Sequence, residues 1–438
     1  MEIDKTTLAD LSILNVEDDF SVFNKLNFCR TAGGRHRLFY NFSTPLKTIE
    51  EIQGIQKTLQ FIIKNEPHWP PQITNGSVLM IEKFYIATID DIPEKPSQAG
   101  VLSYKLFSSA DYSFVKFSTE HTFDFIKGMQ QFVKYFLNTD APAPIKRLME
   151  SISVSINKKE FEVIAANKKS KDLNNTNQLM LANYFRYRFK HTMQELVEIY
   201  YQLDAWYGMA MAVKNHHLVF PSFSTEQKPL LDIKGLYHPL LQQPVGYDVR
   251  LLPGKNFLFL TGANMAGKST FIKSVGTAVF LAHIGMGVPA QSMELSVFDG
   301  LLSNINIMDN IVKGESYFYN EVQRIKSTVQ KISDHRNWLI LIDELFKGTN
   351  VQDAMKCSTV VVEGFLKIPN TVFILSTHLY EIGEQLKQYP NIIFNYFETA
   401  VNGEELVFNY QLKDGISNDR LGYVILKNEG VVDMLQKL

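Results

Sequence analysis

The chain has 438 residues, of which 45% are hydrophobic and 21% charged, so it contains enough apolar material for two or three folded domains. Its 44 Lys and Arg residues nearly balance its 46 Asp and Glu residues, and the formal net charge is −2. This balance excludes a strong overall attraction to nucleic acid, so any DNA contact has to come from local patches.

Other features of the sequence concern the cellular compartment. Cys29 and Cys357 are the only cysteines, which excludes a disulfide framework and indicates a reducing environment. No apolar run reaches the length needed to cross a membrane, and the charged start Met1-Glu-Ile-Asp-Lys5 is unlike a secretion signal. We therefore expect a cytoplasmic protein with no membrane partner.

The first half of the sequence is predicted to be helical. Apolar residues recur at helical spacing over residues 49–63 and 119–137, and residues 178–214 are predicted to form one long helix. The stretch 220–229, rich in Pro and Ser, then has the composition of a linker.

A phosphate-binding loop follows this linker. The apolar strand Phe257–Leu260 leads into a Gly-x-x-x-x-Gly-Lys-Ser string, and a long helical pattern comes directly after it. Such a loop presents successive backbone N–H groups to phosphates, and the helix N-terminus adds its positive end. Lys268 is expected to reach the β- and γ-phosphates and Ser269 to hold Mg²⁺. The predicted nucleotide-binding residues are Gly262, Ala263, Asn264, Met265, Ala266, Gly267, Lys268, Ser269 and Thr270.

Two later strands are predicted to bring acidic and basic side chains to the nucleotide. The apolar run that begins at Trp338 ends in Asp343 and Glu344, as expected of a parallel strand buried on both faces. Asp343 is predicted to bind Mg²⁺ and Glu344 to polarise the attacking water. A further apolar run from Thr371 leads to His378, which we expect to sense the γ-phosphate.

The adenine base needs a flat apolar or aromatic surface, which is usually supplied by the chain just ahead of the phosphate loop. Tyr247 lies in that stretch, and we predict that it or its neighbour Val245 packs against adenine.

Taken together, these motifs closely resemble the MutS family of DNA mismatch-repair ATPases. The Asn264-Met265 pair inside the phosphate loop is much more specific than the generic motif. Further similar segments, in chain order, are Ile3–Leu8, Thr31–Arg35, Pro45-Leu46, Leu203–Ala205, Tyr237–Pro239, Gly314–Glu321, Asp343–Asp353, Ser376–His378 and Gly415–Gly430.

The resemblance implies a helical core and lever domain over residues 1–228, with a reduced or absent clamp. It implies a doubly wound, mostly parallel α/β P-loop ATPase domain of the ABC type over residues 229–438. A homodimer would hydrolyse ATP with Mg²⁺ at composite sites, which Ser316 of the neighbouring subunit would complete. Sequence differences at Asn304, Tyr317, Tyr319, Phe346 and Lys347, where the family usually has Arg, Thr, Met, Gly and Arg, affect no phosphate or magnesium ligand.

The resemblance begins at the family's core domain, so we expect no mismatch-reading wedge and no connector domain. The position of the clamp is occupied by a short polar segment with five lysines, which either contact phosphates or form a solvated face. These lysines are Lys158, Lys159, Lys168, Lys169 and Lys171.

The predicted function is therefore that of an ATP-driven switch on duplex or branched DNA in repair or recombination, with a possible repair-protein partner. Two alternatives stay open at this point. One is a switch that acts on a protein instead of DNA, which salt-dependent binding to DNA would distinguish. The other is a detached transporter ATPase, against which Glu315-Ser316-Tyr317 counts because it lacks the Leu-Ser-Gly-Gly-Gln pattern.

Overall fold

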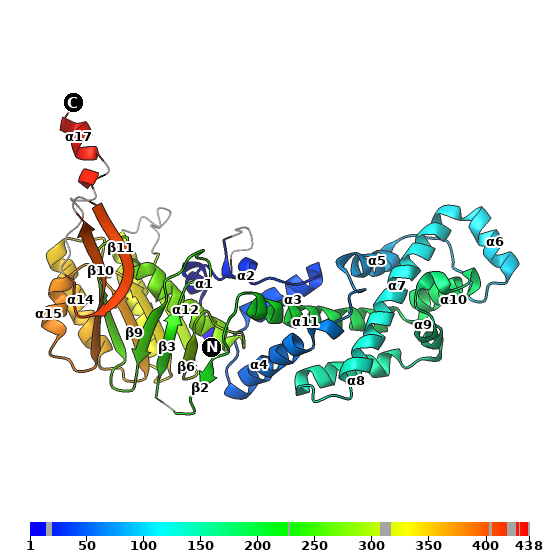
Figure 1. The fold of residues 1–438 in the computed structure, drawn as a ribbon, viewed down its shortest axis with the longest axis horizontal. Coiled ribbons are helices and arrows are strands. Elements are labelled where there is room, and N and C mark those ends of the chain that lie inside the picture. The colour runs from blue at the N-terminus through cyan, green and yellow to red at the C-terminus, as the bar shows by residue number, and fades with distance from the viewer. Residues whose placement is uncertain are drawn as a thin grey trace. The chain divides into compact units, whose positions relative to one another are not determined.

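The computed structural model describes residues 1–14, 20–226, 228–306, 317–402, 405–417, 426–428 and 430–436. The chain forms two compact units (Figure 1). The helical unit consists of Leu26–Ser43 and Gly54–Lys214, and the α/β unit consists of Met1–Lys25, Thr44–Gln53 and Asn215–Leu438.

The helical unit is built mainly from nine α-helices. These are α3 (Ala32–Ser43), α4 (Ile49–Lys64), α5 (Asn75–Ile86), α6 (Gln98–Phe107), α7 (Ser109–Phe136), α8 (Ala143–Ile156), α9 (Glu162–Ala166), α10 (Asn175–Asn183) and α11 (Lys190–Asn215). The region predicted as one helix over 178–214 is interrupted by a π-helical turn at Tyr184–Arg188, where two hydrogen bonds run from Arg186 to the carbonyls of Phe84 and Ala87.

Aromatic side chains form the core of the helical unit. The Tyr200 ring on α11 lies 5.9 Å from that of Phe125 and 6.4 Å from that of Phe132, both on α7. Trp69 meets Phe132 edge-on at 4.8 Å. The apolar spacing predicted over residues 119–137 therefore corresponds to the buried face of the second half of α7.

A buried carboxylate fixes the start of α3. Asp204 on α11 is fully buried and accepts hydrogen bonds from the backbone N–H groups of Arg30 and Thr31 at 3.0 and 2.8 Å and from Thr31 Oγ1 at 2.7 Å. A Cβ at Gly34 would lie 2.0 Å from Asp204 Oδ2, so only glycine lets the two helices approach this closely. Thr31–Arg35 and Leu203–Ala205, two of the matched segments, thus form one structural contact.

The α/β unit contains two sheets. The larger has the order β1-β7-β8-β9-β5-β10-β11, in which all neighbours are parallel except β10 and β11. Its strands are β1 (Glu2–Ile3), β5 (Phe257–Thr261), β7 (Gly300–Asn304), β8 (Trp338–Asp343), β9 (Thr371–Ser376), β10 (Ile392–Asn402) and β11 (Glu405–Asp414). The smaller sheet has the order β2-β6-β3-β4, with β2 (Ser222–Phe223), β3 (Leu231–Leu236), β4 (Tyr247–Leu251) and β6 (Ser292–Leu295).

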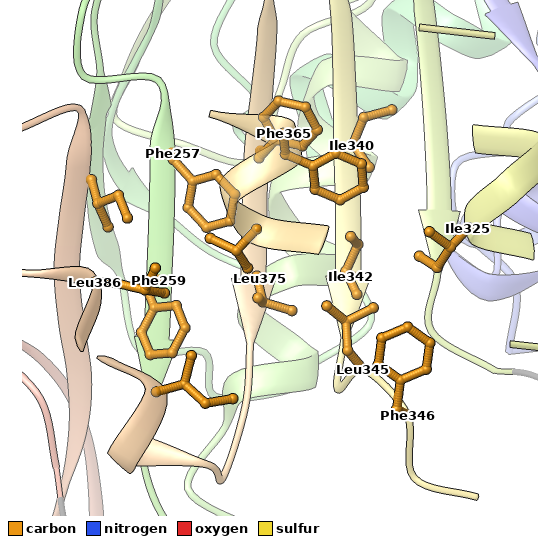
Figure 2. Close-up of a cluster of buried hydrophobic side chains, with 14 of the residues drawn as sticks. Phe257, Phe259, Ile325, Ile340, Ile342, Leu345, Phe346, Phe365, Leu375 and Leu386 are labelled. Carbon is orange, nitrogen blue, oxygen red and sulfur yellow. The ribbon is translucent and has the colours of Figure 1, made fainter. Parts of the chain in front are cut away.

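Helices cover both faces of the larger sheet. The helices that the structure describes with bounds in this unit are α1 (Lys5–Asp10), α2 (Val22–Lys25), α12 (Lys268–His283), α13 (Tyr317–Ile332), α14 (Val351–Phe365), α15 (Tyr380–Leu386) and α17 (Val431–Gln436). Alternate residues of β5, β8 and β9 pack with Ile325 of α13, Phe365 of α14 and Leu386 of α15 in one buried cluster (Figure 2). On the opposite face Gly276 of α12 approaches Leu341 of β8. The expected α/β sheet with a helical region is confirmed.

Residues Met1–Lys25 belong to the α/β unit. The expected domain boundary at residue 228 had placed them in the helical domain. The Glu2 N–H donates to Asp299 O at 2.6 Å, and β1 pairs in parallel with β7. Asp10 then accepts hydrogen bonds from Ser303 Oγ at 2.6 Å and from two backbone N–H groups beyond β7. A strand of two residues has no periodicity, so sequence patterns could not place it.

Candidate nucleotide-binding site

The loop between β5 and α12 has backbone angles that favour glycine. Gly262 and Gly267 have φ values of 140° and 105°, and Met265 between them has 70°. A Cβ at Gly262 would lie 3.2 Å from the carbonyl oxygen of Phe397, so the strand β10 also limits this position. The five residues of β5 before the loop are all buried, which anchors it at the carboxyl edge of the sheet.

Lys268 is the first residue of α12, and its ammonium group lies inside the loop. Its Nζ donates to the carbonyl oxygens of Gly262 at 2.7 Å and Ala263 at 2.9 Å, and the residue is only 5% exposed. Burial lowers the pKa of Lys268, and the nearby Glu344 and Asp343 carboxylates oppose that shift. A buried ammonium whose partners are neutral loop carbonyls fits an anion that would replace them.

Ser269 and Asp343, the two predicted magnesium ligands, are hydrogen-bonded to each other. Ser269 Oγ donates to Asp343 Oδ2 at 2.5 Å, and Ser376 Oγ at the end of β9 donates to Asp343 Oδ1. The pair supplies hydroxyl and carboxylate oxygens, the donor type that Mg²⁺ prefers. Among the described residues no group of three or more His, Cys, Asp or Glu side chains is arranged to hold a metal.

Glu344 follows β8 in a left-handed conformation, with φ 64°, and its N–H donates to Ser376 O at 3.0 Å. Its carboxylate contacts His378 Nδ1 at 3.5 Å and Lys347 Nζ at 3.2 Å. The hydrogen bond with His378, assisted by the charge of Lys347, lowers the pKa of Glu344 to about 2 against the effect of burial. His378 therefore lies beside the predicted base, together with Lys347, to which the sequence had given no role.

A cavity of about 440 Å³ opens beside the loop and reaches from Glu344 to the aromatic residues of β4 and β11. Tyr247 lines it, but this side chain is 5% exposed and packs edge-on against Phe271 and Phe397 at 5.5 and 5.6 Å. Val245 is 38% exposed in the same wall.

Tyr410 on β11 is the half-exposed aromatic side chain of this cavity, with 40% exposure and φ 54°. Its Cδ1 lies 3.3 Å from the position that a Cβ at Gly267 would occupy. Sequence reasoning missed this residue because it lies far along the chain and reaches the loop only through the order β5-β10-β11.

Thr270 and the loop residues Asn264 and Met265 also line the cavity, whereas the loop residues Ala263 and Ala266 are buried. Ser316, the predicted signature serine, lies outside the described residues. The described helices include none that is both long and apolar enough to cross a membrane.

Comparison with known proteins gives one consistent result. Residues 258–435 match the family described as MutS domain V. The DNA mismatch repair protein MutS of Thermotoga maritima is 30% identical over 250 residues, which cover 56% of this chain and 31% of that protein. MutS of Pseudothermotoga lettingae is 32% identical over 232 residues, covering 52% and 28%. The DNA mismatch repair protein MSH3 of Vanderwaltozyma polyspora is 30% identical over 232 residues, covering 50% and 22%. The similarity thus spans less than a third of each relative.

Proposed function

The carboxyl-terminal part of this chain belongs to the MutS family, and on that premise we propose that the protein is a Mg²⁺-dependent ATPase of the ABC type. The main support is that Lys268 and Ser269 at the start of α12 meet Asp343 and Glu344 at the end of β8, at one edge of the sheet beside a cavity. General folding needs do not require a buried ammonium, a hydroxyl–carboxylate pair and an ionised glutamate in one place.

Binding of the triphosphate rests on the loop and on Lys268. The backbone N–H groups of residues 262–270 would bind the phosphates, and the Lys268 ammonium would exchange its two carbonyl partners for phosphate oxygens. Ser269 and Asp343 would hold Mg²⁺. Held by these two residues, Mg²⁺ would supply positive charge against the negative charge of the phosphates.

Hydrolysis rests on Glu344. Because its pKa is about 2, this carboxylate is ionised throughout the neutral range and is ready to orient and polarise a water molecule. His378, which is partly exposed and in contact with Glu344, would keep the carboxylate facing the γ-phosphate and contact that phosphate itself.

The nucleobase would occupy the aromatic and aliphatic end of the cavity. Tyr410 offers the ring face there and Val245 an aliphatic wall, while Tyr247 contributes an edge because Phe271 and Phe397 cover most of its ring.

A phosphate-release assay tests the ATPase. Glu344→Gln should keep ATP affinity and lower the turnover rate by about a hundredfold to ten-thousandfold, since the base is lost and the phosphate cradle stays. The matched control Glu384→Gln changes an exposed glutamate of α15 whose contact is to Lys387, and it should turn over at the native rate. Native turnover by the Glu344→Gln protein would rule out this base.

We further propose that two copies of the chain associate head to tail, with Ser316 of each completing the other's site. Ser316→Arg should then bind ATP and lose hydrolysis. Mixing this variant with Lys268→Ala would place both lesions at one interface and leave the other intact, so part of the activity should return. Specific activity that is unchanged by dilution and by mixing would indicate a monomeric enzyme.

ATP turnover is proposed to drive a conformational change of the helical unit on duplex or branched DNA, in the cytoplasm and in a repair or recombination process. The support is the named activity of the relatives, DNA mismatch repair. Binding to duplex, mismatched and junction DNA, with and without ATP and over a range of salt, tests it. Salt-sensitive binding is expected, and its absence on every substrate would favour a protein partner.

A further inference from the structure

A side chain of helix α13 is hydrogen-bonded to the loop that follows β8. Glu321 on that helix is 2% exposed, and its two carboxylate oxygens accept hydrogen bonds from two consecutive peptide groups of the loop. The Lys347 N–H donates to Oε1 at 3.0 Å and the Gly348 N–H to Oε2 at 3.2 Å. One charged side chain therefore fixes the backbone three and four residues beyond Glu344.

Aromatic packing closes the same contact. The Phe318 ring of α13 lies 5.7 Å from the ring of Phe346, which is 4% exposed (Figure 2 shows Phe346 beside Leu345). Phe346 has φ 59°, a conformation that glycine adopts without strain and phenylalanine does not. A Cβ at Gly348 would lie 2.7 Å from the Phe318 backbone nitrogen, so the loop and the start of α13 are in direct contact.

The backbone that begins at Glu344 is attached at two points. At one end of the loop, the Glu344 N–H donates to Ser376 O of β9. At the other end, the Lys347 N–H donates to Glu321 of α13. Between these two attachments lie two non-glycine residues in left-handed conformations, Glu344 and Phe346. A strained segment of this kind relaxes when one attachment is removed, and the carboxylate at its start moves with it.

We propose that Glu321 is a positioning residue for hydrolysis, which holds the 344–348 loop so that the Glu344 carboxylate faces the attacking water. This role rests on the ATPase function proposed above. It predicts a separation of turnover from binding, because Glu321 holds the loop that carries Glu344, whereas Lys268 and Ser269 sit on α12.

Glu321→Gln tests the proposal, because the amide keeps the shape of the side chain and presents N–H where one loop N–H needs an acceptor. The turnover number should fall at least tenfold, while the dissociation constant of ATP changes less than twofold. Gln323→Ala, an exposed change two residues along α13, should alter neither quantity. In a Glu344→Gln background, Glu321→Gln should cause no further loss in single-turnover hydrolysis, because the group that it positions is already absent.

Hydrogen exchange of the nucleotide-free protein gives a second measurement that does not depend on ATP. The amides of Lys347 and Gly348 should exchange at least tenfold faster in the Glu321→Gln protein, and those of β8 at the native rate. Native turnover with Glu321→Gln, or losses that multiply in the double variant, would overturn the positioning role. A wild-type protein that hydrolyses no ATP would instead refute the proposed function, while the exchange measurement would still report whether Glu321 fixes the loop.

Discussion

Asp204 in the helical unit and Lys268 in the α/β unit are both buried charged side chains, but they have different kinds of partners. Asp204 accepts from two backbone N–H groups and a hydroxyl at the start of α3. Lys268 donates to two carbonyls of a loop with left-handed backbone angles. Burial shifts the pKa of each group toward its neutral form. The comparison shows that burial alone does not distinguish the two groups, whereas the chemical type of their partners does.

Lys268→Ala should separate these two cases most clearly. Losing a buried charged donor to phosphate is expected to weaken ATP binding by about 4 kcal/mol, roughly a thousandfold, because the phosphates lose their charged contact. The fold should be retained, since the two carbonyls left behind can accept from water. Isothermal titration together with thermal unfolding measures both effects. Equal ATP affinity in the variant and the native protein would contradict the role of Lys268.

Asp204→Ala should give the opposite pattern. Removing this carboxylate leaves two buried N–H groups at the start of α3 without an acceptor, and we expect the helical unit to lose about 3 kcal/mol of stability. Denaturant unfolding measures this loss. Turnover of ATP by the folded protein should be unchanged. A specific loss of ATP binding would contradict a purely structural role of Asp204.

Tyr410→Ala sharpens the comparison within the nucleotide site. Loss of one ring face against the base should weaken ATP binding by about 1–2 kcal/mol, roughly tenfold, with no effect on inorganic triphosphate. Competition titrations with ATP and triphosphate measure this difference. Tyr247→Leu is the control for the buried aromatic group, because its ring packs mainly against Phe271 and Phe397. An equal loss for both ligands would assign Tyr410 to the phosphate end of the cavity.

The smallest expected effect concerns pH. A carboxyl whose folded pKa of about 2 lies below its ordinary 4.5 stabilises the fold above pH 4.5, and this contribution is lost as the pH falls toward 2. Lys347→Ala removes one cause of the shift, so the pKa of Glu344 rises and less stability is lost on acidification. We expect a difference below about 1 kcal/mol between pH 6 and pH 3, because Lys347 is partly exposed. Identical acid sensitivity would mean that Lys347 does not contribute to this pKa.

The parts of the site that could be predicted from sequence are those whose residues are close together along the chain. Gly262 to Thr270 form one motif, and Asp343-Glu344 ends an apolar run, so elementary rules on parallel sheets brought them to the same edge. Their structural proximity agrees with that reasoning, while their chemical roles stay predictions.

Other residues depend on strand order and on loop conformation, which sequence patterns do not encode. Tyr410 reaches the cavity because β10 places β11 one strand away from β5, and Glu321 accepts from a loop in which Phe346 has a left-handed backbone. The sequence shows that Tyr247 is aromatic, but it does not show that Phe271 and Phe397 pack against its ring. These contacts join distant segments, and no local pattern in the sequence indicates them.

The pairing of β1 with β7 makes the α/β unit discontinuous, with the helical unit inserted between its parts. Glu2 meets Gly300, so at about 5–20 residues per second the ribosome needs roughly 15–60 s to complete the partner of the first strand. The helical unit, which ends at Lys214, is therefore completely synthesised long before the larger sheet, whose last strand ends at Asp414. Of the strands in this sheet, β1 therefore waits longest for its neighbour, and β8, β9, β10 and β11 are still to be made when β7 arrives.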